Sequence, residues 1–199
     1  MGSWNLALII YLAVAIITFV PVLLAIFKKV KLKPGGDTFK DSPHFSDQNK
    51  LKLQQHYSRI QGTLVFWKNE AAWYKRFHYY TLIWTIPVSI LIPIISQSLD
   101  GTNVSKLFLT VISSHVALLI GFHRAFKVES NFRAFRNGES EFYDLYRRLL
   151  DRPNSFGETE DQQIESYFIE VEFIRKAVRV SETDNLPIIE DPKPAKTSL

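Results

Sequence analysis

Two apolar runs joined by a short polar loop limit the folds that this chain can adopt. The runs extend over Thr81–Leu99 and Leu107–Phe126, and Arg124 is the one Asp, Glu, Lys or Arg residue in them. Each run has about the length that an α-helix needs to cross the hydrocarbon core of a bilayer. Because the connecting loop is short, the two helices must be antiparallel neighbours. We therefore predict a transmembrane helical hairpin with crossings at residues 80–99 and 107–126.

A third apolar run, Leu6–Phe27, carries no charged residue and is followed at once by Lys28 and Lys29. A cleaved signal peptide would place basic residues before a shorter apolar core. The pattern instead favours an N-terminal transmembrane helix within residues 1–27. Residues 28–79 hold eleven Lys and Arg against four Asp and Glu, whereas residues 1–27 hold none. The positive-inside rule then predicts a multi-pass protein with its N-terminus outside and its C-terminus in the cytoplasm.

Heptad spacing on both sides of the hairpin predicts helices that extend out of the membrane. Residues 28–47 are rich in Pro, Gly and polar side chains and are predicted to be a linker. From residue 48 an apolar stripe at spacings of three and four runs into the first hairpin helix without a strong breaker. Its members are Leu53, Tyr57, Ile60, Leu64, Trp67, Ala71, Tyr74 and His78.

A second stripe follows the hairpin. Its members are Val128, Phe132, Phe135, Phe142, Tyr146 and Leu149, with Glu139 filling one gap. Nothing from His123 to Asn137 is a strong helix breaker, so we predict that the second hairpin helix continues through this segment. Both stripes leave the same membrane face, and we expect them to meet as an antiparallel, coiled-coil-like pair.

A further amphipathic helix is expected to pack on this pair. Thr159 and Gln162 have the spacing of a capping box at its start. Its apolar face would be formed by Ile164, Tyr167, Phe168, Val171, Ile174 and Val178. Residues 181–199, which contain three prolines, are predicted to be a disordered tail. The predicted fold class is therefore an all-α membrane protein, with a helical domain over residues 48–180.

Several residues inside the predicted crossings are candidates for packing or for a polar pathway. Pro87 and Pro93 favour kinks that serve either as a hinge or only as packing shape. His115 is an ionisable residue at membrane depth, which suits either a functional site or a hydrogen bond to a neighbouring helix. One helix face carries small residues that favour close helix contact or line a polar path. That face is formed by Thr110, Ser114, Ala117 and Gly121.

The sequence excludes several kinds of chemistry. It has no cysteine, and it lacks a glycine-rich phosphate loop, a His-x-x-x-His spacing and a serine nucleophile elbow. His78 and His123 fall near the predicted inner membrane face, where a shared metal site is less expected than two interfacial histidines. Basic residues near that face suit anionic lipid, and their mixture with acids does not suit nucleic acid. We expect no enzymatic activity and no cofactor.

An aromatic and basic segment, Trp73–Tyr80, precedes the hairpin, and a Phe-x-x-Glu element formed by Phe126 and Glu129 follows it. Phe132, Phe135 and Arg136 then occupy the places of a Trp-x-x-Tyr-Arg element. Residues 66–180 thereby resemble the SLATT family, two-transmembrane domains associated with SMODS nucleotidyltransferases and SLOG sensors. Phenylalanine stands at both aromatic positions of the second element, and Glu139 or Glu141 takes the place of the glutamate that usually follows.

The resemblance implies a role in a bacterial conflict system and a location in the bacterial inner membrane. Such domains are proposed effectors that oligomerise in the membrane and compromise it after a partner detects phage or a nucleotide signal. These 199 residues contain no nucleotidyltransferase or SLOG domain, so a separate sensor protein is expected. The alternative is a non-conducting anchor or sensor subunit that recruits a cytoplasmic partner.

Overall fold

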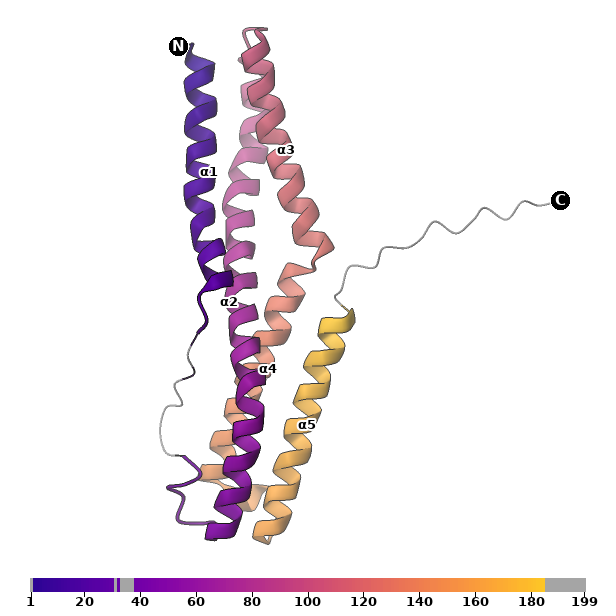
Figure 1. The fold of residues 1–199 in the computed structure, drawn as a ribbon. Coiled ribbons are helices and arrows are strands. Elements are labelled where there is room, and N and C mark those ends of the chain that lie inside the picture. Colours follow the sequence, from indigo (N-terminus) through magenta and orange to yellow (C-terminus); the bar gives the residue numbers. More distant parts are fainter. Residues whose placement is uncertain (1, 31, 33–37, 185–199) are drawn as a thin grey trace, which may run out of the picture.

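The computed structural model describes residues 2–30, 32 and 38–184 and is all-helical over these residues (Figure 1). Its five α-helices are α1 (Ser3–Phe27), α2 (Asp47–Gln97), α3 (Asn103–Ala125), α4 (Val128–Asp151) and α5 (Glu160–Asp184). A short 3-10 turn, Pro153–Ser155, connects α4 to α5. The predicted all-α class is confirmed. Three helices, α1, α2 and α3, are long and apolar enough to cross a membrane.

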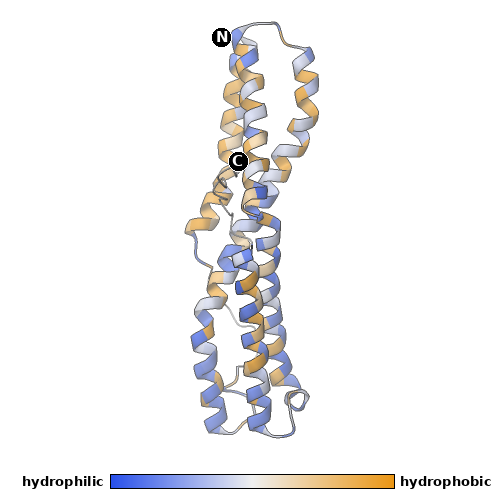
Figure 2. Ribbon diagram, turned by 90° about the vertical axis from the view of Figure 1, so that its right-hand side faces the viewer, coloured by the Kyte–Doolittle hydropathy of each residue, from blue (hydrophilic) through white to orange (hydrophobic). Residues whose placement is uncertain are grey.

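The molecule divides into two halves along its long axis. The apolar half contains α1, α3 and the part of α2 that follows residue 79, and the polar half contains the rest of α2 with α4 and α5. Figure 2 shows hydrophobic residues covering the helices of the first half and hydrophilic residues dominating the second. In the apolar half, large side chains such as Ile17 and Ile83 are about two-thirds exposed. This surface suits contact with lipid.

The helix α2 is continuous through both halves, as the unbroken stripe predicted. Leu53 and Leu64 are fully buried, and Trp67 and Ala71 are buried further along the same face. The stripe keeps its spacing inside the apolar half, where Thr81, Thr85 and Val88 are buried. One continuous helix can therefore turn the same face toward its neighbours over its whole length.

The second stripe lies on α4 and packs against the first one. Tyr74 of α2 stacks on Phe135 with ring centroids 6.1 Å apart, and Tyr57 lies 5.5 Å from Tyr146. The later residue of α2 thus contacts the earlier residue of α4, so the two helices are antiparallel. The predicted pairing of these two faces is confirmed.

The prediction that the second hairpin helix continues out of the membrane segment is wrong. Helix α3 ends at Ala125, and Lys127 adopts a left-handed conformation with φ 41° and ψ 48° before α4 begins. The Asn131 side chain donates a hydrogen bond of 2.9 Å to the Phe126 carbonyl, which stabilises the turn. Because of this turn, the apolar stripe of α4 faces α2. The stripe begins at Val128, which is fully buried.

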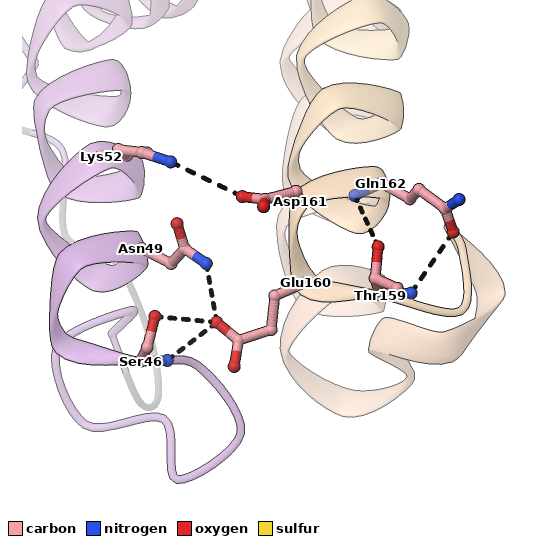
Figure 3. A network of polar contacts seen from close by, with 7 residues as sticks. All are labelled: Ser46, Asn49, Lys52, Thr159, Glu160, Asp161 and Gln162. Carbon is pink, nitrogen blue, oxygen red and sulfur yellow. Dashed lines mark hydrogen bonds and ion pairs between the residues drawn. The ribbon is translucent and has the colours of Figure 1, made fainter.

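Helix α5 packs on the α2–α4 pair through the predicted apolar face, and its start is capped as predicted. The backbone N–H of Gln162 donates to the Thr159 hydroxyl (3.4 Å), and the side-chain oxygen of Gln162 accepts from the backbone N–H of Thr159 (3.3 Å). The next residue, Glu160, reaches across to the start of α2 (Figure 3). It accepts hydrogen bonds from the amide and hydroxyl of Ser46 and from the side chain of Asn49. These contacts fasten α5 to the start of α2.

Part of the predicted linker is packed into the polar half. Phe39 and Phe45 are almost fully buried in the core that α2, α4 and α5 share. His44 Nε2 donates to the side-chain oxygen of the buried Gln163 (2.8 Å). Helix α5 also extends four residues beyond the predicted end of the helical domain, to Asp184. The remainder of the predicted tail, 185–199, lies outside the described residues.

Candidate functional site

The most distinctive polar site in the apolar half is His115, which joins all three of its helices. The Tyr11 hydroxyl on α1 lies 2.7 Å from His115 Nδ1, and the Tyr80 hydroxyl on α2 lies 3.3 Å from Nε2. The Tyr80 hydroxyl also donates to the Ala15 carbonyl of α1 at 3.3 Å. Since a hydroxyl has one proton to donate, the Nε2–H of His115 donates to Tyr80 and Nδ1 accepts from Tyr11.

This assignment fixes a neutral imidazole with both ring nitrogens engaged. Trp84 completes the surroundings, because its ring lies 5.1 Å from that of Tyr11 and 5.5 Å from that of His115. Its indole N–H donates to the Thr18 hydroxyl at 3.0 Å. Such hydrogen bonds between membrane helices contribute about 0.6 kcal/mol each on average. The arrangement joins helices and needs no metal or charged partner.

Sequence reasoning identified His115 but not its partners. Tyr11 and Thr18 are the only hydrogen-bonding side chains in the apolar run Leu6–Phe27. They stand seven residues apart and therefore share one helix face. That pair was the signal that this face of α1 meets polar groups on other helices.

The small-residue face of α3 does not pack against α1 or α2. Thr110, Ser114, Ala117 and Gly121 are exposed, and a Cβ added at Gly121 would meet no atom within 4 Å. The Thr110 hydroxyl donates to a carbonyl of its own helix, that of Lys106. The helix uses another face for packing, formed by Ser105, Phe108, Ile112, Val116 and Leu119. Within one chain, the small-residue face is therefore free for lipid or for another copy.

A groove of about 490 Å³ lies between α1 and α3 beside His115. Thr110 and Ser114 line it from α3, and Tyr11 and Phe19 line it from α1. Two of the predicted residues thus lie in the same groove as the His115 site. Gly121 lies about two helical turns beyond Ser114 and does not line this groove.

The two prolines of α2 do not interrupt the helix. Pro87 and Pro93 both lie within Asp47–Gln97 and have exposed side chains. Pro87 lines a second groove, of about 380 Å³, to which α1, α2 and α3 all contribute. Their rings have no N–H to donate, and the Pro93 carbonyl accepts a hydrogen bond from the Ser96 hydroxyl of the same helix (2.8 Å).

A second pair of histidines lies where the apolar and polar halves meet. His78 Nδ1 and His123 Nε2 are 2.8 Å apart, so one ring donates and the other accepts. This bond requires that at least one of the two imidazoles be neutral. Among the residues that the structure describes, no group of three or more His, Cys, Asp or Glu side chains is arranged to hold a metal ion.

The residues of the family-like motif fall into two environments. Phe126 and Glu129 are exposed next to the turn, and Glu129 pairs with Arg133 at 2.6 Å. The other members lie on or beside the face of α4 that packs on α2. Phe135 and Glu139 are buried there, and Phe132 is half-buried against the same core.

Glu139 is the charged residue at the centre of the α2–α4 contact. Its carboxylate lies 2.7 Å from the Arg136 guanidinium and 3.5 Å from the Lys68 ammonium of α2. A buried carboxylate with two cations is stabilised where an isolated one would not be. Glu139 therefore acts as a structural link between the two helices.

Comparison with known proteins gives no relative for this arrangement. No family model, no curated protein and no solved structure matches the chain.

Proposed function

We propose that the protein is a membrane effector of a bacterial conflict or antiphage defence system, which oligomerises to form a pore or disrupt the membrane. The observation that carries the proposal is an apolar stripe left exposed on α5 in the polar half. Ile169, Phe173 and Val180 are 58%, 71% and 50% exposed, respectively. Exposed apolar stripes of this kind, outside a membrane, mark protein–protein contacts. A second copy of the chain is the partner proposed here.

In this proposal the polar half lies in the cytoplasm and the N-terminus lies outside. The distribution of Lys and Arg supports that orientation, since residues 28–79 carry eleven against none in residues 1–27. The coiled-coil-like cytoplasmic helices receive a signal from a separate sensor protein, in line with the resemblance to the SLATT family. Helix α2 supports a mechanical connection, because it is unbroken from the polar half to the far end of the apolar half.

Three apolar helices cannot enclose a water-filled pore within one chain, so conduction requires several copies. The exposed face of α3 that carries Thr110, Ser114 and Gly121 supplies polar and small residues for such an assembly. His115 lines the same groove as Thr110 and Ser114.

The test uses the purified full chain in dye-loaded liposomes and in expressing bacteria. We expect dye release, loss of membrane potential and an oligomer in detergent. Phe173→Glu places a charge in the α5 stripe and should reduce both oligomerisation and leakage. Arg179→Glu, at another exposed position of α5, is the matched control and should preserve them. An unchanged oligomer in the Phe173→Glu variant would refute the role of the stripe.

A non-conducting anchor or sensor subunit is the second candidate, and the hydrogen-bonding of His115 favours it. Because both ring nitrogens are engaged within the chain, the imidazole is explained by helix packing alone. His115→Leu separates the candidates. Loss of leakage with an unchanged oligomer supports a conducting role. Full leakage in this variant assigns His115 to packing. Liposomes that stay sealed with the wild-type oligomer, together with co-purification of a cytoplasmic protein, would support the anchor.

A further inference from the structure

A cavity of about 600 Å³ lies between α1 and α2 where the apolar half meets the polar half. Its wall changes character along its length. Lys75 and Arg76 line the end toward the polar half, whereas Ile83 and Trp84 line the end within the apolar half. Eight residues separate Lys75 from Ile83 on α2, which corresponds to about 12 Å along the helix axis. The cavity is therefore cationic at one end and apolar at the other.

The depth of this cavity matches the boundary of a bilayer. On α2 the long apolar segment begins after Tyr79 and Tyr80, and both tyrosines line the cavity. On α1 the apolar run ends at Phe27 and two lysines follow. Tyrosine and tryptophan side chains prefer the level of the lipid headgroups. The cationic end therefore lies at headgroup depth and the apolar end at acyl-chain depth.

Neither cation of the cavity has a counter-charge among the described residues. The Arg76 guanidinium donates one hydrogen bond, of 2.8 Å, to the Pro21 carbonyl of α1. This contact leaves its charge unneutralised and four of its five N–H groups free for other acceptors. Among the described residues, neither Lys75 nor Arg76 forms an ion pair with a carboxylate. Two neighbouring unpaired cations at the membrane boundary attract anionic lipid headgroups.

We propose that this cavity binds one anionic phospholipid from the leaflet on the side of the polar half. The phosphate lies between the Lys75 ammonium and the Arg76 guanidinium, which can form short, charge-assisted hydrogen bonds to its oxygens. An acyl chain follows the apolar wall toward Ile83 and Trp84. A soluble phosphate would leave that wall uncovered, so the shape and polarity of the cavity favour a lipid.

The lipid would stabilise the packing of α1, the least buried of the three apolar helices. Helix α1 buries only Ala15, Val22 and Ala25 against the rest of the chain. Arg76 already joins α1 to α2 through the Pro21 carbonyl, and a phosphate bound by the same guanidinium extends that connection. The site does not depend on whether the protein conducts.

The experiment measures lipid retained by the purified full chain in detergent, by native mass spectrometry. The probes are dioleoylphosphatidylglycerol and, as the neutral lipid, dioleoylphosphatidylcholine. We expect the protein to retain the anionic dioleoylphosphatidylglycerol in preference to the neutral lipid. Loss of one basic contact should weaken binding about fivefold, and loss of both about 25-fold. Lys75→Gln tests the first value and Lys75→Gln/Arg76→Gln the second.

The matched control is Lys28→Gln/Lys29→Gln, which removes the same charge from the same membrane side but outside the cavity. It should retain the lipid within about twofold of the wild type, because it leaves both cavity cations in place. Ala72→Phe fills the cationic end without changing charge and should also abolish retention. This variant and Lys75→Gln test the site even if the double variant does not fold, as judged by circular dichroism.

Three results would overturn the proposal. The first is wild-type retention in both Lys75→Gln and Ala72→Phe. The second is equal retention of the neutral lipid, which would show that the cavity binds lipid through apolar contacts alone. The third is displacement of the anionic lipid by millimolar glycerol 3-phosphate, which would assign the site to a soluble phosphate.

Discussion

Helix α2 and the α3–α4 segment cross the same boundary between the apolar and polar halves, but only α2 crosses it as one helix. The difference lies in the phase of their buried stripes, that is, in whether the spacing of buried residues continues unchanged across the boundary. On α2 the stripe passes Tyr74 and His78 and continues at Thr81, Thr85 and Val88 without a change of spacing. A single helix therefore satisfies the packing of both halves.

On the other segment the stripe changes phase at the boundary. The α3 stripe includes Ile112, Val116 and Leu119, and the same spacing would next reach residues 123 and 126. The α4 stripe begins instead at Val128. The offset of two residues corresponds to about 200° of rotation around a helix. A straight helix would direct one stripe away from α2, and the left-handed turn at Lys127 removes this conflict.

The test with the largest expected effect on stability inserts the same two residues at each of the two crossings. An Ala-Ala insertion between His78 and Tyr79 would rotate one half of α2 by about 200° relative to the other. One of its stripes would then lose its partners. Since each buried Leu, Ile or Phe contributes about 1.5–3 kcal/mol, we expect a loss above 5 kcal/mol and unfolding of the polar half.

The matched insertion places Ala-Ala between Phe126 and Lys127, in the existing turn. We expect the free energy of unfolding to fall by less than about 2 kcal/mol, because a turn can absorb extra residues. Circular dichroism of denaturant unfolding and limited proteolysis in detergent measure both variants. If the two insertions destabilise the protein equally, stripe phase does not explain the difference between the crossings.

The stripes themselves were predictable from the sequence, because they consist of apolar residues that recur at spacings of three and four. The break at Lys127 was missed because no Pro or Gly stands there, and its cause is a phase change that appears only when two stripes are compared. The partners of His115 could not be predicted from the hairpin alone. They depend on where α1 packs, and in the otherwise apolar run of α1 only the pair Tyr11 and Thr18 indicates the packed face.

The second test concerns how closely α4 approaches its neighbours. A Cβ at Gly138 would lie 2.4 Å from Val178 Cγ2 of α5 and 3.4 Å from the Trp67 ring of α2. Valine has little freedom to move away. We expect Gly138→Ala to lower the free energy of unfolding by about 1–3 kcal/mol in chemical denaturation.

Gly62 on α2 is the matched control, since a Cβ there would meet no atom within 4 Å. Gly62→Ala should stabilise the protein by about 0.5–1 kcal/mol, because alanine loses less backbone entropy in a helix. Stabilisation by both substitutions would contradict the close contact at Gly138.

The third test uses pH to probe the contact between α2 and α5. Burial lowers the pKa of His56 from 6.5 to about 4, and the nearby Arg59 and Arg175 act in the same direction. Its ring stacks on Phe168 with centroids 4.1 Å apart. As pH falls from 6.5 toward 4, the unfolded chain binds a proton that the folded chain does not. Stability must therefore fall over this range.

The loss should be about 1–2 kcal/mol, after allowance for the partial exposure of the ring. His56→Phe retains the stacking and removes the titration, so it should flatten the pH dependence of the unfolding free energy between pH 6.5 and 4. A variant with the same slope as the wild type would assign the pH dependence to other groups.

The smallest expected effect tests the turn that distinguishes α3–α4 from α2. Lys127 is the one residue other than glycine with a positive φ among the described residues. A non-glycine residue in this conformation costs about 1 kcal/mol, and glycine does not incur this cost. Lys127→Gly should therefore stabilise the protein by up to about 1 kcal/mol. The variant also loses the 2.5 Å hydrogen bond from the Lys127 ammonium to the exposed Asp184 carbonyl, which reduces the gain.

Lys127→Ile provides the opposite case, since a β-branched residue tolerates positive φ poorly. Both variants remove the ammonium, so the difference between their unfolding free energies isolates the backbone conformation. We expect glycine to be more stable than isoleucine by at least 1 kcal/mol. Equal stabilities would mean that the chain at residue 127 can return to a helical conformation. The stripes of α3 and α4 would then be reconciled by bending rather than by the turn.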